Sequence, residues 1–148
     1  MIAGARTDYE EDMSADTYTA DTTGSENEEN SPLQFENVGQ FVENYVAIVF
    51  NRQFSAQMHW CPQWWAHPEA VEKFTALWQT WEYMRVNEGP CWLSKYSTYY
   101  WFPIMREITG AGGPFQGCSP IKGHSPSTDY PDGLPCVEAP VEVVTPRG

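Results

Sequence analysis

Three segments of the chain are predicted to be helical, and in the first two the apolar side chains recur at steps of three and four positions, which is the spacing of one face of an α-helix. The first segment spans residues 38–52, the second begins at Pro68, and the third spans residues 93–108. In the first, the recurring positions are Val38, Phe41, Val42, Tyr45 and Val49. The pattern predicts a mainly α fold, a small three-helix-type domain with an aromatic-rich core.

The second segment has the clearest start and stop signals. His67 stands at the cap position, Pro68 at the first helical position, and Glu69 in the first turn, where its charge is favourable to the helix dipole. Gly89 and Pro90 mark the end. Along the helix, a stripe at steps of three and four consists of Val71, Phe74, Trp78, Trp81 and Arg85, with Leu77 beside it, and all of these except Arg85 are apolar. Four residues fall off the stripe and are expected to be solvated: Glu72, Lys73, Gln79 and Glu82.

The third segment is ambiguous, because its Y-S-T-Y-Y-W-F run has the composition of a strand. Pro103 argues against a central strand, since proline cannot donate to a sheet. We therefore favour a helix that is broken or kinked near Pro103. A turn over residues 110–114 follows, and Phe115 is expected to return to the core.

The charge of the chain is unevenly distributed. Its formal net charge is −12, and residues 1–36 hold ten of the 20 carboxylates with Arg6 as the only base. Residues 1–34 also have almost no aliphatic side chains, so they are expected to form a disordered acidic tail. Five prolines predict an extended tail over residues 125–148. The helical domain is thus placed at residues 35–124, and all seven tryptophans fall inside it.

This composition argues against two classes of partner. The eight Lys and Arg residues form no cluster, so direct binding to nucleic acid is not expected. No apolar run of secretory length is visible at the start, and the longest run, Tyr45 to Phe50, is far too short to span a bilayer. We expect a soluble cytoplasmic protein without membrane association. In that compartment its four cysteines are expected to be free thiols or metal ligands.

Two Cys/His pairs share one spacing. Cys61 precedes His67 by six positions, and Cys118 precedes His124 by the same number. Two thiolates and two imidazoles are a common tetrahedral ligand set for structural zinc. Three interpretations are open. A shared zinc site and two unrelated Cys/His pairs have about equal support from the sequence, and a Cys61–Cys118 disulfide or redox pair has less. His59 is an alternative imidazole.

Catalysis has little support in the sequence. A zinc-dependent hydrolase or nuclease-like enzyme would use Cys61, His67 and Cys118 as ligands and Glu69 as the general base. The alternative to this enzyme class is a binding module with a protein partner. The tryptophan cluster at Trp60, Trp64 and Trp65 is mostly core by composition, and any part that remains exposed is a candidate partner-binding patch. A third interpretation makes the acidic tail a decoy that mimics nucleic acid.

The run W-C-P-Q-W-W-A-H-P-E-A-V from Trp60 to Val71 resembles a motif of a small family of unknown function. Further matches are Leu77, Trp78, Trp81, Glu82, Arg85, Gly113, Pro114, Phe115 and Cys118. The family is common in actinobacteria and in their plasmids, integrative elements and phages. The resemblance covers roughly residues 38–124 and implies a cytoplasmic accessory protein of a mobile genetic element, with no known activity.

The resemblance also bears on the metal site. Cys61, His67 and Cys118 match family positions, which favours a metal. Between Trp92 and Met105, however, family members tend to carry histidines where this chain has Tyr96 and Tyr100. That departure favours packing or partner binding over catalysis. We therefore expect a non-enzymatic protein-interaction module with a structural zinc at Cys61, His67, Cys118 and His124.

Overall fold

The computed structural model describes residues 32–126 and 130–144. Almost all of the acidic tail, residues 1–31, lies outside them, so its expected disorder stays a prediction. The described residues form helices and loops without a strand, which confirms the mainly α class. None of the described helices combines the length and the apolar composition that crossing a membrane requires.

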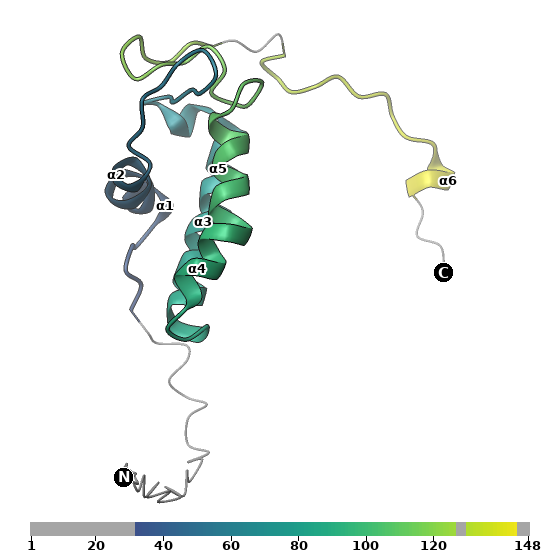
Figure 1. Ribbon diagram of the computed structural model, residues 1–148. Coiled ribbons are helices and arrows are strands. Elements are labelled where there is room, and N and C mark those ends of the chain that lie inside the picture. Colours follow the sequence, from purple (N-terminus) through teal and green to yellow (C-terminus); the bar gives the residue numbers. More distant parts are fainter. Residues whose placement is uncertain (1–31, 127–129, 145–148) are drawn as a thin grey trace, which may run out of the picture. The chain divides into compact units, whose positions relative to one another are not determined.

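Two helical runs and one long helix make up the domain (Figure 1). The first run consists of α1 (Val38–Phe41), the π-helical turn η3 (Val42–Val46) and α2 (Ala47–Val49). A loop and the 3₁₀ turn η4 (Trp64–Ala66) lead to the long helix α3 (Pro68–Asn87). The second run consists of α4 (Trp92–Tyr96), the π-helical turn η5 (Ser97–Trp101) and α5 (Phe102–Thr109). Near the end of the chain lies α6 (Val141–Val144).

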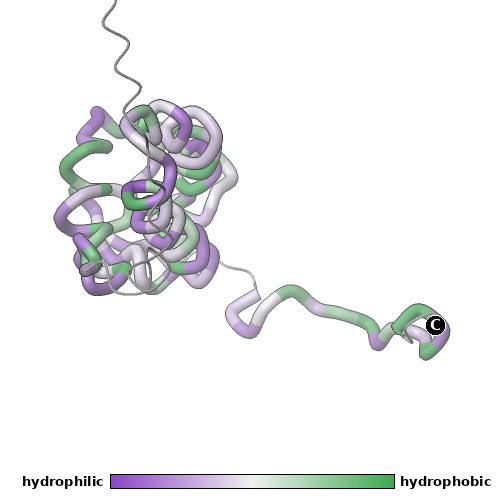
Figure 2. The backbone as a smooth tube through the Cα atoms, turned by 90° about the horizontal axis from the view of Figure 1, so that it is seen from below, coloured by the Kyte–Doolittle hydropathy of each residue, from purple (hydrophilic) through white to green (hydrophobic). Residues whose placement is uncertain are grey.

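The long helix begins and ends where the sequence predicts. His67 is its N-cap residue, Pro68 is in its first turn, and Asn87 is its last residue before Gly89. The helix α3 packs against α1, α4 and α5, and in Figure 1 it lies alongside the second run. Its buried face carries Ala70, Phe74, Leu77, Trp81 and Met84. Along the domain, hydrophobic and hydrophilic stretches alternate, as Figure 2 shows, which is typical of amphipathic helices.

The ambiguous third segment is a helix that continues through Pro103. The π-helical turn η5 ends two residues before the proline, and the Phe102 amide donates to the Ser97 carbonyl oxygen five residues back. In a regular helix the proline ring collides with the carbonyl four residues earlier, and a widened turn relieves that collision. The Tyr96 hydroxyl donates to the Leu77 carbonyl oxygen of α3 at 2.9 Å. Tyr96 stands where the family resemblance leads us to expect a histidine, and its side chain is part of the core.

Aromatic rings fill the core at both ends of α3. At one end, the rings of Phe35, Phe41 and Tyr45 pack on Trp81 with centroids 5.2 to 6.3 Å apart. At the other end, Phe115 packs on Phe74 and on Trp60, at 6.3 and 5.5 Å between centroids. The expected return of Phe115 to the core is confirmed, since its side chain is fully buried.

The expectation that Glu82 is solvated is wrong. Its side chain is only 7% exposed. Its two oxygens accept hydrogen bonds from the backbone amides of Phe35 at 2.8 Å and Gln34 at 3.2 Å, and Arg85 pairs with it at 3.0 Å. The carboxylate therefore fixes the chain that enters α1 on the surface of α3. Glu72 and Gln79 are exposed as expected, and Lys73 is half-buried.

We expect Glu82→Gln to lower the free energy of unfolding by about 2 kcal/mol, because one amide N–H of the new side chain would face a backbone donor. Urea unfolding followed by tryptophan fluorescence measures the change. The control is Glu72→Gln on the same helix, whose exposed carboxylate forms no ion pair with any described residue. Equal stability of the two variants would contradict a structural role for the Glu82 carboxylate.

Candidate metal centre

The two Cys/His pairs meet at the start of α3. One ligand atom from each of Cys61, His67, Cys118 and His124 lies within 4.8 Å of all the others. Both cysteines are buried and both histidines are half-buried. All four cysteines of the chain are free thiols, so the disulfide between Cys61 and Cys118 does not form here.

The first pair is positioned by the approach to α3. Cys61 lies in the loop that leads into η4, three residues before Trp64, and the His67 amide donates to the Trp64 carbonyl oxygen as that short turn closes. His67 caps α3 without using its side chain as the cap. Its imidazole is therefore available to the cluster. The Pro68 that follows fixes the helix start, which fixes the direction from which the imidazole arrives.

The second pair is positioned by a small hairpin. Ser119 and Gly123 exchange two backbone hydrogen bonds of 3.2 and 2.9 Å, and Ser119 Oγ accepts from the Lys122 amide at 2.8 Å. Gly123 has a φ of +84°, which favours glycine there. The hairpin brings Cys118 and His124 together at its base, with Cys118 Sγ 3.9 Å from His124 Nδ1.

The distances between the ligand atoms fit one tetrahedral ion. Zinc bonds of about 2.3 Å to sulfur and about 2.05 Å to nitrogen, at tetrahedral angles, place S and N about 3.6 Å apart and two nitrogens about 3.3 Å apart. Cys61 Sγ lies 3.3 Å from His124 Nδ1, and Cys118 Sγ lies 3.6 Å from His67 Nε2. The two imidazole nitrogens, His124 Nδ1 and His67 Nε2, are 3.1 Å apart. The four residues therefore fit a zinc ion.

Backbone donors face both sulfur atoms. The Ser125 amide donates to Cys118 Sγ at 3.3 Å, and the Gln63 backbone donates to the Cys61 sulfur. Such bonds stabilise a thiolate, which is the form that binds a metal. These donors could not be found from the sequence, because backbone amides carry no residue signature.

Without an ion, burial favours the neutral forms of Cys61 and His67. Burial, together with the neighbouring Cys118, raises the pKa of Cys61 to about 11. Burial and then the charge of His124 lower the pKa of His67. At neutral pH the cluster on its own thus keeps Cys61 protonated and His67 neutral. A neutral imidazole is ready to bind a metal, whereas the thiol must lose its proton to the solvent as the metal binds.

An aromatic wall backs the cluster. The His67 ring lies 5.2 Å from the Phe115 ring and 4.8 Å from the His124 ring, centroid to centroid. Phe115 is three residues before Cys118, and the Cys118 amide donates to its carbonyl oxygen at 3.0 Å. The buried phenylalanine therefore holds the second pair against α3.

The remaining candidates lie outside the cluster. Cys91 and Cys136 are exposed. His59 is buried, but it is not one of the clustered ligands, and its Nε2 has no hydrogen-bond partner among the described residues. Glu69 forms an ion pair with Lys73 at 2.7 Å.

The tryptophan cluster divides between core and surface. Trp64 is 8% exposed and belongs to the core. Trp60 is partly buried against the core, next to Phe115. Trp65 is 63% exposed, so only one of the three candidate partner-binding residues presents its ring to solvent.

The fold and the cluster define a small helical domain with a Cys₂His₂ group that could hold a metal. The chain belongs to a protein family described as Domain of unknown function (DUF4913), which it matches over residues 35–140. The resemblance to a family of unknown function is thereby confirmed, and the match includes all four clustered residues. No curated protein and no solved structure matches this chain.

We expect Phe115→Ala to lower the free energy of unfolding by about 3–5 kcal/mol, because it leaves a cavity beside Phe74, Trp60 and His67. Thermal and urea unfolding measure the loss. The matched control is Phe102→Ala, which removes a ring that is 53% exposed and is expected to cost less than about 1 kcal/mol. Similar losses in both variants would show that Phe115 does not anchor the segment to the core.

Proposed function

We propose that this chain is a non-enzymatic protein-interaction module whose fold is stabilised by one structural zinc ion. The observation that carries the proposal is the convergence of four buried or half-buried ligand atoms, from two loops, within 4.8 Å of one another. A tetrahedral set of two sulfurs and two nitrogens is the preference of zinc among the common metals. Zinc in this site would cross-link the loop before α3 to the hairpin that follows Phe115.

The ligand set supports a structural role over a catalytic one. Catalytic zinc keeps one position open for water, whereas four protein ligands close the coordination sphere. The hydrolase or nuclease-like alternative also needs a general base, and its candidate Glu69 is paired with Lys73 at 2.7 Å. Lys73 contacts Glu107 of α5 at 2.8 Å as well, so the three side chains join two helices.

The partner surface would include Trp65. This residue belongs to η4, only two positions before His67, and its ring is 63% exposed. Large aromatic side chains are the most frequent anchors of protein interfaces. A metal that holds Cys61 and His67 would hold both ends of η4 and so fix the direction of Trp65. We infer that the zinc orders the surface that meets a protein partner.

The setting we propose is the cytoplasm of a bacterium, where the chain serves as an accessory protein of a phage, plasmid or integrative element. The motif from Trp60 to Val71, with its resemblance to an actinobacterial family, supports this origin. Four free thiols suit a reducing compartment. The decoy alternative would act through the acidic residues 1–36. A chain that lacks residues 1–31 loses nine of their ten carboxylates but keeps Gln34 and Phe35 on Glu82. With that chain, a decoy loses its partner, and a core-mediated module keeps it.

Purified protein is expected to carry one zinc ion per chain, measured by native mass spectrometry. Removal by a chelator should lower the thermal midpoint, because the metal binds the folded state alone. Cys118→Ser should not retain the ion, and its thermal midpoint should fall by about as much as on removal of the metal. Cys91→Ser is the matched control, since this exposed thiol lies outside the cluster, and it should retain both.

Two results would contradict the structural zinc. One is a metal-free protein whose thermal midpoint does not rise when zinc is added. The other is a cobalt-substituted protein without the sulfur-to-metal charge-transfer absorption of a thiolate site. A zinc-loaded protein with a bound, exchangeable water would instead favour the catalytic alternative.

Trp65→Ala is expected to abolish binding of the protein partner. The thermal midpoint should change by no more than about 2 °C, because the ring contributes little to the core. Affinity capture from cells that carry the gene, with quantitative mass spectrometry, compares the variant with wild type. Tyr99→Ala is the control, a similarly exposed aromatic residue on η5. A partner retained by Trp65→Ala, or lost equally in Tyr99→Ala, would remove Trp65 from the interface.

A further inference from the structure

The basic residues of the described chain fall into two groups. Three of them form ion pairs: Lys73 with Glu69 and Glu107, Arg85 with Glu82, and Lys95 with Glu88. The other three form no ion pair with any described residue, and these are Arg52, Arg106 and Lys122. The described residues hold ten carboxylates and only six Lys and Arg side chains, so three cations without an ion pair stand out.

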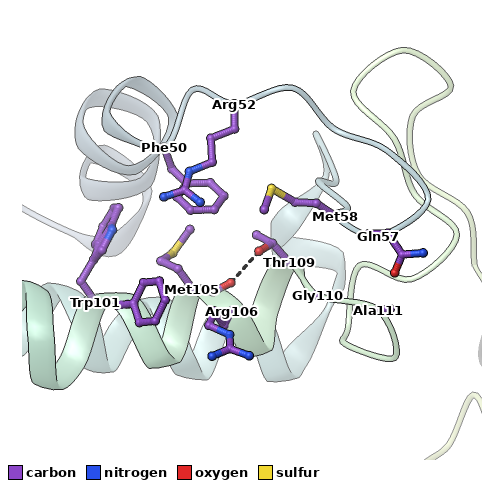
Figure 3. Close-up of a pocket in the computed structure, with 11 residues that line it drawn as sticks. Phe50, Arg52, Gln57, Met58, Trp101, Met105, Arg106, Thr109, Gly110 and Ala111 are labelled. Carbon is purple, nitrogen blue, oxygen red and sulfur yellow. Dashed lines mark hydrogen bonds between the residues drawn. The ribbon is translucent and has the colours of Figure 1, made fainter.

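The three unpaired cations line two adjoining cavities. The first cavity has a volume of about 370 Å³, and Arg52 and Arg106 are on its wall (Figure 3). The second has a volume of about 460 Å³, shares Arg52 and Met58 with the first, and adds Lys122. The buried His59, whose Nε2 lacks a partner among the described residues, lines the second. Both volumes are in the range of small-molecule sites.

The first cavity is apolar between its two arginines. In Figure 3 the side chains of Phe50, Met58 and Met105 converge on its centre. The Arg52 guanidinium lies over the Phe50 ring, 4.4 Å from the centroid, and the Arg106 guanidinium lies 5.6 Å from the centroid of the Phe102 ring. A guanidinium stacked in this way keeps its N–H edge free for a carboxylate or phosphate. Methionine side chains adapt to the shape of a bound group.

We propose that the first cavity binds a small organic anion, a carboxylate or phosphate attached to an apolar group. Arg52 and Arg106 lie on opposite sides of the apolar centre in Figure 3, and both would attract the anionic group to the cavity. The Phe50, Met58 and Met105 side chains would cover the apolar part. A long polyanion fits less well, because three cations on a strongly acidic protein neutralise few phosphates. This site is separate from the proposed zinc function, since neither arginine belongs to the cysteine and histidine cluster.

The test is a titration of the ¹⁵N-labelled full chain, as purified, followed by NMR, with phenyl phosphate and benzoate as probes. We expect saturable shifts at Met58, Thr109 and the arginine side chains. Inorganic phosphate lacks the apolar part and benzyl alcohol lacks the charge, so each is expected to bind at least about tenfold more weakly. Tighter binding of phenyl phosphate than benzoate would identify phosphate as the preferred group, and the reverse would identify carboxylate.

The variants Arg52→Gln and Arg106→Gln are each expected to weaken binding about tenfold, the loss of one charge-assisted hydrogen-bonding group. Both side chains are exposed, so the thermal midpoint should stay unchanged. Lys95→Gln is the matched control: it makes the same change in net charge at a distant ion pair and should bind as wild type. Three outcomes would overturn the proposal: equal weakening in Lys95→Gln, equal binding of benzyl alcohol, or tighter binding of a short single-stranded DNA to the same residues.

Discussion

The buried face of α3 is the constraint on which the rest of the structure depends. This helix spans Pro68–Asn87 and carries buried apolar side chains from Ala70 to Met84, in a domain that has no sheet in its described part. The run from α1 to α2 and the run from α4 to α5 cover part of that face. Loops cover the remainder, with Trp60 and Phe115 packed on Phe74. Because a loop has no hydrogen-bond ladder of its own, it keeps its position only where side chains attach it to the helix.

Such attachments occur at both ends of α3. Near its end, the Glu82 carboxylate accepts from the amides of Gln34 and Phe35 and so fixes the chain that enters the domain. At its start, His67 meets Cys61, Cys118 and His124. The two attachments differ in what they need. The carboxylate is already satisfied by protein donors, whereas the two thiols and two imidazoles of the cluster are held only by packing and hydrogen bonds unless an ion joins them. Zinc would add coordinate bonds between the loop before α3 and the hairpin after Phe115, which otherwise meet only by packing and hydrogen bonds.

The basic side chains of the described residues have two different roles: some form ion pairs within the fold, and others line a cavity. Lys73 joins Glu69 of α3 to Glu107 of α5, and Arg85 pairs with the buried Glu82 carboxylate. Arg52 and Arg106 contribute no such contact to the described residues, and both are stacked on aromatic rings at the edge of one cavity. A cation that serves no ion pair, and that is held in place by a ring, is preorganised for an incoming anion. The same small fold thus carries three separate proposed sites. They are a protein-binding surface at Trp65, a zinc site at the cysteine and histidine cluster, and an anion site at this cavity.

Local features of the sequence determined the helices. Apolar spacing, His67 with Pro68, and Gly89 set the bounds of α3, and these signals act within a few residues of where they stand. The equal spacing of Cys61–His67 and Cys118–His124 singled out the cluster. It could not choose between a shared site and two unrelated pairs, because the two halves are more than 50 residues apart and only packing brings them together. Glu82 was misjudged for the same reason: its position off the apolar stripe predicts solvent, but its partners at Gln34 and Phe35 arrive from 47 or more residues away. The tertiary structure alone decided which polar groups meet, since hydrogen bonds and metal ligands depend on distances in space that periodicity along the chain does not encode.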